Sequence, residues 1–80
     1  GIDLRQADLS YTNLQNVDLS YSNLEGANLA EADLRFANLR NTDLSDANLQ
    51  GTNLEFALLD NAILSGANLK CLNHPICKND

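Results

Sequence analysis

The chain has 80 residues and a mass of 8.7 kDa, which suits one small domain. It carries 11 acidic and 5 basic side chains, which give a formal charge of −6 and an isoelectric point near 4.3. Because the basic residues are few and scattered, we expect no direct binding to a nucleic-acid backbone, which needs clustered lysine and arginine. No apolar run approaches the roughly 18 residues of a membrane span, so we expect no membrane insertion either.

Leucine recurs at every fifth position from Leu4 to Leu69, fourteen times without a gap. The residue two before each leucine is nearly always small, and the residue immediately before it is Asp or Asn in twelve of the fourteen repeats. We name these positions the leucine slot, the small slot and the Asx slot. The two residues that follow each leucine are the first and second turn slots. Such a strict period marks a repeat protein.

A period of five fits neither an α-helix nor an extended strand. On a helix, successive leucines would be rotated by about 140° and would not form a stripe. On a strand, an odd period would place them on alternate faces. The chain must therefore bend once in each repeat, with the leucine and small slots facing inward, which describes a β-solenoid. Asp and Asn suit the bends because their short side chains bond nearby backbone groups.

The number of sides follows from which outward residues stack in successive coils. With four sides, residues 20 apart stack, so that Arg5 lies over Glu25 and every aspartate in an Asx slot meets Asn or Ile. With three sides, residues 15 apart stack, and Asp3, Asp18 and Asp33 form one column of like charge. Since like charges placed directly opposite are destabilising, the sequence favours four sides.

The recurring A(D/N)LXX unit, as at Ala7, Asp8 and Leu9, resembles the pentapeptide repeat family, and the resemblance covers residues 1 to about 73. It implies an all-β fold, a right-handed quadrilateral β-helix, and fourteen units at four per coil give about 3.5 coils. We predict this β-helix for residues 1–70. The pattern fails at His74 and Pro75, so we predict a C-terminal cap for residues 71–80.

The two cysteines, Cys71 and Cys77, both lie in the predicted cap. If they are oxidised, their disulfide closes a short loop over the last coil. The alternatives are free or buried thiols, or a metal site with Cys71, His74 and Cys77 as ligands and Asp80 as a fourth. We favour the disulfide, and we expect neither a metal ion nor a cofactor.

The sequence places no residues in a recognised catalytic pattern. Five of the eleven acids occupy Asx slots, where Asn stands in other repeats, so hydrogen bonding explains them better than acid–base catalysis does. His74 is the single histidine, and no nucleophile is spaced to use it. We therefore expect a protein that is not an enzyme and has no catalytic residues.

The acidity raises an alternative function, because some pentapeptide repeat proteins bind DNA gyrase as acidic rods that imitate DNA. Here the five Asx-slot aspartates supply most of the net charge, and the outward turn slots are nearly neutral. In a four-sided coil these aspartates divide over all four sides, so we expect no acidic stripe. A DNA-mimicking, gyrase-binding protein is therefore the less favoured interpretation.

The outward aromatic residues indicate an interaction surface. Four sides place Phe36 under Phe56, with Ile76 extending the column, while Tyr11 and Tyr21 lie elsewhere. Stacked Phe residues either form a cross-strand ladder that stabilises the fold or mark the centre of a protein contact. Under the second interpretation Phe36, Phe56 and Ile76 form the contact.

We predict a non-enzymatic structural scaffold or protein–protein interaction module. The sequence begins within a repeat, at Gly1, so another alternative is an accessory C-terminal repeat domain of a larger regulatory protein or enzyme. The expected partner is a protein, with self-association through the end coils or the Phe36–Phe56 face as a further expectation. By resemblance, such proteins are abundant in cyanobacteria and occur in the chloroplast thylakoid lumen. With the cysteine pair, this favours the thylakoid lumen or the periplasm over the cytoplasm.

Overall fold

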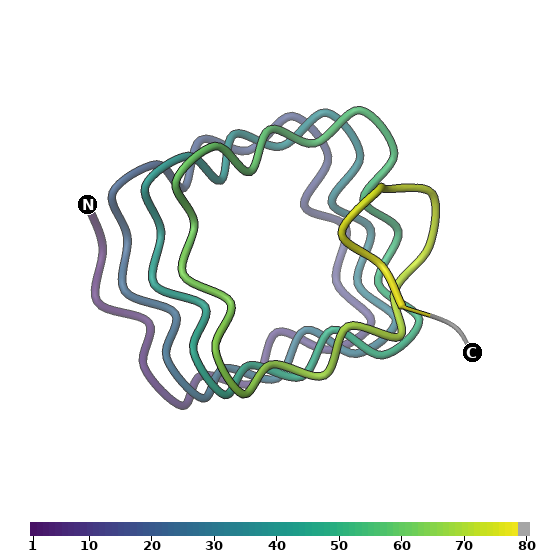
Figure 1. Cartoon of the computed structure of the whole chain (residues 1–80). Coiled ribbons are helices and arrows are strands. Elements are labelled where there is room, and N and C mark those ends of the chain that lie inside the picture. The colour runs from purple at the N-terminus through teal and green to yellow at the C-terminus, as the bar shows by residue number, and fades with distance from the viewer. Residues whose placement is uncertain (79–80) are drawn as a thin grey trace.

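In the computed structural model, which describes residues 1–78, the chain winds into a short rod with four sides (Figure 1). The described residues contain no helix and no strand longer than one paired residue. Each pair is a parallel bridge between the Asx slots of neighbouring coils, 20 residues apart, except the last, which joins Asn53 to Leu72. The bridges are Asp3–Asn23, Asp8–Asn28, Asn13–Asp33, Asp18–Asn38, Asn23–Asp43, Asn28–Asn48, Asp33–Asn53, Asn38–Leu58, Asp43–Ile63, Asn48–Asn68 and Asn53–Leu72.

The four sides follow one another in chain order. Figure 1 shows the chain turning counter-clockwise as it approaches the viewer, which is the sense of a right-handed coil. We number the sides from the N-terminus. Side 1 contains residues 2–4, 22–24, 42–44 and 62–64; side 2 contains 7–9, 27–29, 47–49 and 67–69; side 3 contains 12–14, 32–34, 52–54 and 72; side 4 contains 17–19, 37–39 and 57–59.

Backbone hydrogen bonds join each coil to the next. On side 1, the Leu4 N–H donates to the Asn23 carbonyl at 2.8 Å, and the Asn23 N–H donates to the Ile2 carbonyl at 2.9 Å. Every leucine-slot N–H from Leu4 to Leu54 donates to the next coil in this way. Among residues 1–78 no further coil follows the last one, residues 57–72, and the cap lies against part of its edge.

The bend after each leucine is a four-residue turn. In the first repeat, the Ala7 N–H donates to the Leu4 carbonyl at 3.1 Å, and Gln6, in the second turn slot, has a φ of 60°. A positive φ at the third residue is what a type II turn requires. The second turn slot keeps a positive φ in every repeat from Gln6 to Gly66, whether its residue is glycine, Asn or a bulky side chain.

The Asx slot holds the start of the same turn. In each of the twelve repeats with Asp or Asn there, the side-chain oxygen accepts a hydrogen bond from the backbone N–H two residues later. The distances run from 2.9 Å at Asp43 to 3.2 Å at Asp3. This is an Asx turn, and it explains why only these two residue types recur in the slot.

The leucine slots form the core of the rod. The seven leucines from Leu24 to Leu54 are fully buried, while Leu4, Leu9 and Leu14 at one end and Leu64 and Leu69 at the other are only partly buried. Polar residues in small slots are bonded: Thr42 Oγ1 donates to the Leu39 carbonyl at 2.8 Å. No buried polar side-chain atom among residues 1–78 lacks a partner.

The structure confirms the separation of 20 residues, and each aspartate in an Asx slot faces Asn or Ile across its bridges. The ion pair of Arg5 differs from the pairing with Glu25 that stacking suggested. Arg5 forms its ion pair with Asp3, two residues before it, at 2.8 Å, and Glu25 only adds an electrostatic contribution. The turn brings the guanidinium back onto the Asx slot of its own repeat, so the closest charges are local. The last bridge, at Leu72, lies two residues beyond the predicted end of the β-helix.

Candidate interaction surface

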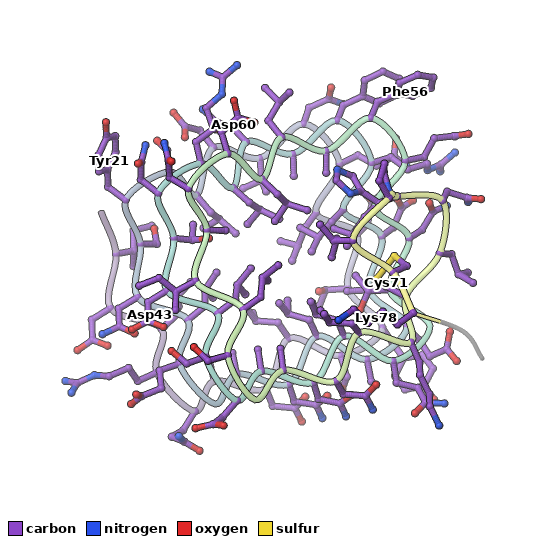
Figure 2. All side chains as sticks on the ribbon, in the orientation of Figure 1. Tyr21, Asp43, Phe56, Asp60, Cys71 and Lys78 are labelled. Atoms are coloured by element: carbon purple, nitrogen blue, oxygen red, sulfur yellow. A yellow bond between two sulfur atoms is a disulfide. The ribbon has the colours of Figure 1, made fainter. Side chains whose placement is uncertain are left out.

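Phe36 and Phe56 stack on the corner between sides 3 and 4, where Figure 2 labels Phe56. Their ring centroids are 5.1 Å apart with an interplanar angle of 22°. The residues are 55% and 67% exposed. Both occupy second turn slots with φ near 60°, so two large apolar rings stand together at the same corner of neighbouring coils. We name this pair the Phe corner.

Ile76 does not extend the Phe corner, and that part of the sequence interpretation is wrong. The column of residues 20 apart ends at Phe56, because the cap leaves the coil after Leu72. Ile76 is partly buried and packs against the hydrophobic core, together with Cys77. Its apolar side chain therefore helps to close the end of the rod and is not part of the outer surface beside Phe56.

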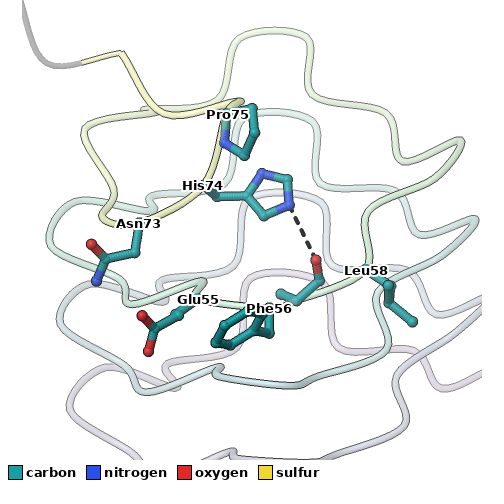
Figure 3. Close-up of a pocket in the computed structure, with 7 residues that line it drawn as sticks. Glu55, Phe56, Leu58, Asn73, His74 and Pro75 are labelled. Carbon is teal, nitrogen blue, oxygen red and sulfur yellow. Dashed lines mark hydrogen bonds between the residues drawn. The ribbon is translucent and has the colours of Figure 1, made fainter.

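A shallow hollow lies between the Phe corner and the cap (Figure 3). Phe56 and the 40%-exposed Leu58 supply its apolar floor, and the cap supplies the opposite wall. The residues lining it are Glu55, Phe56, Ala57, Leu58, Asn73, His74 and Pro75. The hollow enlarges the apolar surface around Phe56, and it has the open shape of a surface that a protein segment could cover.

His74 fixes the wall of this hollow. Its Nε2 lies 3.1 Å from the Ala57 carbonyl, and the Ile76 N–H donates to its Nδ1 at 3.3 Å (Figure 3 shows the first contact). Both bonds are satisfied together when the imidazole is neutral and carries its proton on Nε2. The ring thereby replaces the backbone N–H that a further coil would have offered to Ala57. His74 is thus a structural residue of the cap.

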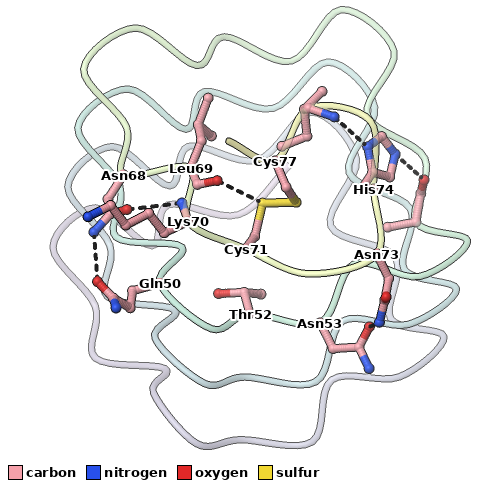
Figure 4. Close-up of a disulfide and its surroundings, with 12 residues drawn as sticks. Gln50, Thr52, Asn53, Asn68, Leu69, Lys70, Cys71, Asn73, His74 and Cys77 are labelled. Carbon is pink, nitrogen blue, oxygen red and sulfur yellow. Dashed lines mark hydrogen bonds between the residues drawn. A yellow bond between two sulfur atoms is a disulfide. The ribbon is translucent and has the colours of Figure 1, made fainter. Parts of the chain in front are cut away.

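Cys71 and Cys77 lie at the base of the cap, where their sulfur atoms are joined in a disulfide (Figure 4). Cys71 is fully buried against the end of the core. The Lys78 N–H donates to the Leu69 carbonyl at 2.7 Å, which ties the far end of the loop to side 2. The cap is therefore fastened by one covalent link and by backbone hydrogen bonds. Asp80, the proposed fourth metal ligand, lies outside the described residues.

Five of the eleven acidic residues are aspartates in Asx slots, and hydrogen bonds from their own turns lower the pKa of each carboxyl. Arg35 donates to Asp33 and holds the pKa of Asp33 well below its usual range. The hydroxyl of Ser10 lowers the pKa of Asp8 in the same way. These aspartates lie on all four sides: Asp3 and Asp43 on side 1, Asp8 on side 2, Asp33 on side 3 and Asp18 on side 4.

Sequence reasoning missed a set of exposed apolar residues in the last coil. Leu58, Ile63 and Leu72 are 40%, 50% and 46% exposed, and each pairs with an Asx slot of the coil before it. Two of them, Leu58 and Ile63, are the exceptions to the Asp/Asn rule. These two exceptions were the available signal in the sequence. The Asx slot is polar in twelve repeats, so apolar residues in two consecutive repeats near the C-terminal end indicate a different local surface.

The described residues form no group of three or more His, Cys, Asp or Glu side chains placed to hold a metal ion. Among residues 1–78 there is also no helix long and apolar enough to cross a bilayer. The candidate binding surfaces are therefore the Phe corner, the adjoining hollow and the apolar edge of the last coil. All three suit contact with another protein surface.

Comparison with known proteins agrees with the repeat. The family model described as pentapeptide repeats matches residues 1–35 and 37–70, in 8 copies. A solved pentapeptide repeat protein from Nostoc Pcc 7120 is 46% identical, with a TM-score of 0.61 over 86% of this chain and 68% of its own. Another, from the cyanobacterium Cyanothece 51142, is 32% identical, with a TM-score of 0.57 over 90% of this chain and 54% of its own. The chain thus spans about two thirds of the first relative and about half of the second. No curated protein sequence matches it.

Proposed function

Since the chain belongs to the pentapeptide repeat family, we propose that it is a rigid, non-enzymatic module that binds a protein partner through the Phe corner. The single observation that carries this proposal is the stacked, exposed pair Phe36 and Phe56. Large aromatic side chains are enriched at the centres of protein interfaces, where their burial supplies much of the binding free energy. Elsewhere the middle of the rod presents polar Asx slots and mixed charges, and its exposed aromatic residues, Tyr11 and Tyr21, stand singly on other corners.

Two features support a contact beyond a simple ladder. The hollow beside Phe56 adds Leu58 and Pro75 to the apolar surface, so a partner can cover more than the two rings. The charged neighbours are also arranged around this centre, since Arg35 is paired with Asp33 at 2.8 Å and Glu55 borders the hollow. An apolar centre with a polar rim is the usual anatomy of a protein interface.

The test uses substitutions that the repeat itself accepts. Asn16 occupies the same column as the Phe pair, one coil earlier, with a φ of 63°, so Phe36→Asn with Phe56→Asn should keep the turn geometry. Affinity capture from the source organism should recover a partner with the native chain and lose it with this variant. The matched control is Tyr11→Asn with Tyr21→Asn, which removes the two exposed aromatics on other corners. Equal recovery by all three chains would overturn the proposal.

The acidic, DNA-mimicking alternative has less support. Its surface would need a continuous negative stripe, whereas the aspartates are divided over four sides and two of them are paired with Arg5 and Arg35. A role as an accessory repeat domain of a larger protein is compatible with the same binding surface. For location, we propose an oxidising compartment, the thylakoid lumen or the periplasm, on the strength of the disulfide.

A further inference from the structure

The hollow beside the Phe corner has an apolar end and a polar end (Figure 3). Leu58 lies at the apolar end, where its side chain is 40% exposed. Glu55 and Asn73 lie at the opposite end, and Phe56 stands between the two ends. Among the described residues that line the hollow there is no lysine or arginine, and Glu55 is the acid. The two ends therefore suit different side chains of a partner.

The carboxylate of Glu55 has no partner within residues 1–78. Arg35 lies one coil below it in the same turn slot, but the Arg35 Nε and Nη2 donate to Asp33 at 2.9 and 2.8 Å. These bonds are the main cause of the raised pKa of Arg35, to which Glu55 adds a smaller electrostatic contribution. No described residue forms an ion pair with Glu55 or donates a hydrogen bond to its side chain. Its negative charge is therefore available to a cation of a partner.

The amide of Asn73 adds an acceptor beside this carboxylate. The backbone N–H of Glu55 donates to Asn53 Oδ1 at 3.1 Å, which fixes the position of that oxygen. Asn73 Nδ2 donates to the same oxygen at 3.2 Å. Since the amide nitrogen of Asn73 faces Asn53, its Oδ1 faces away, and no described residue donates to it. The polar end of the hollow thus offers a carboxylate and an amide oxygen to a donor.

The cap does not supply the complementary positive charge. His74 uses one ring nitrogen for the Ala57 carbonyl and the other for the Ile76 N–H, an arrangement that requires a neutral ring. Lys78 lies at the far end of the described part of the cap, and Figure 2 shows it well apart from Phe56. A partner must therefore bring the cation to this end of the hollow.

We propose that the hollow binds a protein segment in which an arginine stands near a large apolar side chain. This inference rests on the proposed function of the Phe corner and names the chemistry of its partner. A guanidinium has several donors in one plane, so it can bond the Glu55 carboxylate and the Asn73 oxygen together while its face lies on the Phe56 ring. The apolar side chain then covers Leu58. Lysine has a compact ammonium group and no planar face, so it fits less well.

The geometry of an extended segment sets the spacing of these two anchors. Residues i and i+2 of such a segment point to the same side and lie about 7 Å apart. The arginine and the apolar residue should therefore be two positions apart, with the arginine toward side 3. Beyond Leu58, side 4 ends at Asp60 (Figure 2), which lies one coil above Arg40 in the same turn slot. These opposite charges offset each other, so the end near Asp60 calls for no second cation.

Selection from a phage-displayed library of short random peptides, with the 80-residue chain immobilised, tests the proposal. The peptides that are enriched should carry an arginine two positions from Phe, Leu or Ile. Fluorescence polarisation of the labelled synthetic peptide then measures its dissociation constant. Replacing the arginine by citrulline, its neutral analogue, should weaken binding at least about tenfold, because a charge-assisted hydrogen bond is lost.

The matched substitution on the protein is Glu55→Gln. Gln15 occupies the same turn slot two coils earlier, so this variant should keep its fold and its melting temperature. It should weaken the arginine peptide by the same factor, and citrulline should weaken that variant no further, as a double-mutant cycle requires of two groups in contact. The control Glu25→Gln removes an acid from the same slot at the corner between sides 1 and 2 and should bind like the native chain.

The outcomes separate this inference from partner binding at the Phe corner itself. Selected peptides should lose binding to the variant Phe36→Asn with Phe56→Asn. Peptides that need the two Phe residues but lack arginine, bind Glu55→Gln like the native chain, or bind equally well with lysine would overturn the inference and leave the Phe corner standing. Peptides that bind the Phe variant unchanged would overturn both. If no peptide is enriched, the inference is wrong, and affinity capture still tests the Phe corner.

Discussion

The middle of the rod and its last coil follow the same five-residue frame but use it differently. From Leu24 to Leu54 every leucine is fully buried, and every Asx slot in that span holds Asp or Asn bonded to its own turn. In the last coil, Leu58 and Ile63 occupy two of the Asx slots, and Leu64 and Leu69 are only partly buried. The backbone path is nevertheless the same in both regions, with positive φ in the second turn slot up to Gly66.

The difference separates what the fold requires from what it tolerates. The leucine column and the turn geometry continue without interruption, so they define the coil. The Asx hydrogen bond can be omitted in two repeats without changing the bridges, since Asn38–Leu58 and Asp43–Ile63 are still formed. The fold therefore tolerates Leu58 and Ile63 in Asx slots, and their exposed apolar side chains are available for binding. The predictions that follow compare substitutions in the middle of the rod with substitutions near its C-terminal end.

The largest expected difference is between core leucines of the two regions. Leu39→Ala, at a fully buried site in the middle, should cost about 2–5 kcal/mol of unfolding free energy, because it removes buried methyl groups and leaves a cavity. Leu64→Ala, at the partly buried end, should cost about half as much or less, since less area leaves water. Urea denaturation of both variants measures the difference. Equal costs would mean that the end is packed as tightly as the middle.

The coil itself could largely be predicted from the sequence. Fourteen leucines in register and the pairing of Asp with Asn at a separation of 20 predicted four sides, and the bridges confirm that separation. The sequence could not place Ile76, because once the repeat ends the period no longer says which residues stack. It also could not reveal the positive φ of Tyr11 or Phe56, because bulky residues rarely adopt it and the turn imposes it.

The cap provides the second comparison, because a disulfide closes its loop in addition to the bridge at Leu72, whereas bridges alone join the coils of the middle. Replacing Cys71 and Cys77 by alanine should lower the unfolding free energy by about 2 kcal/mol, the value for closing a short loop. The effect should be local, so amide hydrogen exchange should accelerate at Leu72 and Lys78 and remain slow at Leu39. Reducing the native chain should reproduce the result. Unchanged exchange at Lys78 would show that its bond to the Leu69 carbonyl holds the cap without the disulfide.

The smallest expected effect concerns the acidic Asx slots, which the last coil lacks. Side-chain hydrogen bonds from Ser10, Ser20 and Ser45 lower the pKa values of Asp8, Asp18 and Asp43 in the folded state. Such carboxyls contribute stability that is present above the unfolded pKa of about 3.9 and is lost as the pH falls through the folded pKa. The melting temperature should therefore be nearly constant from about pH 7 to about pH 5 and should fall below about pH 4.

Replacing these three aspartates by Asn, the residue that fills the slot in other repeats, keeps the acceptor for the backbone N–H and removes the ionisable group. The triple variant should match the native chain near pH 7 and lose less of its melting temperature in acid, as circular dichroism at a series of pH values would measure. If both chains lose stability equally below about pH 4, the acid sensitivity comes from outside these three slots. Since Asp60 is the only acid between residues 57 and 78, the first two coils should then be searched before the last.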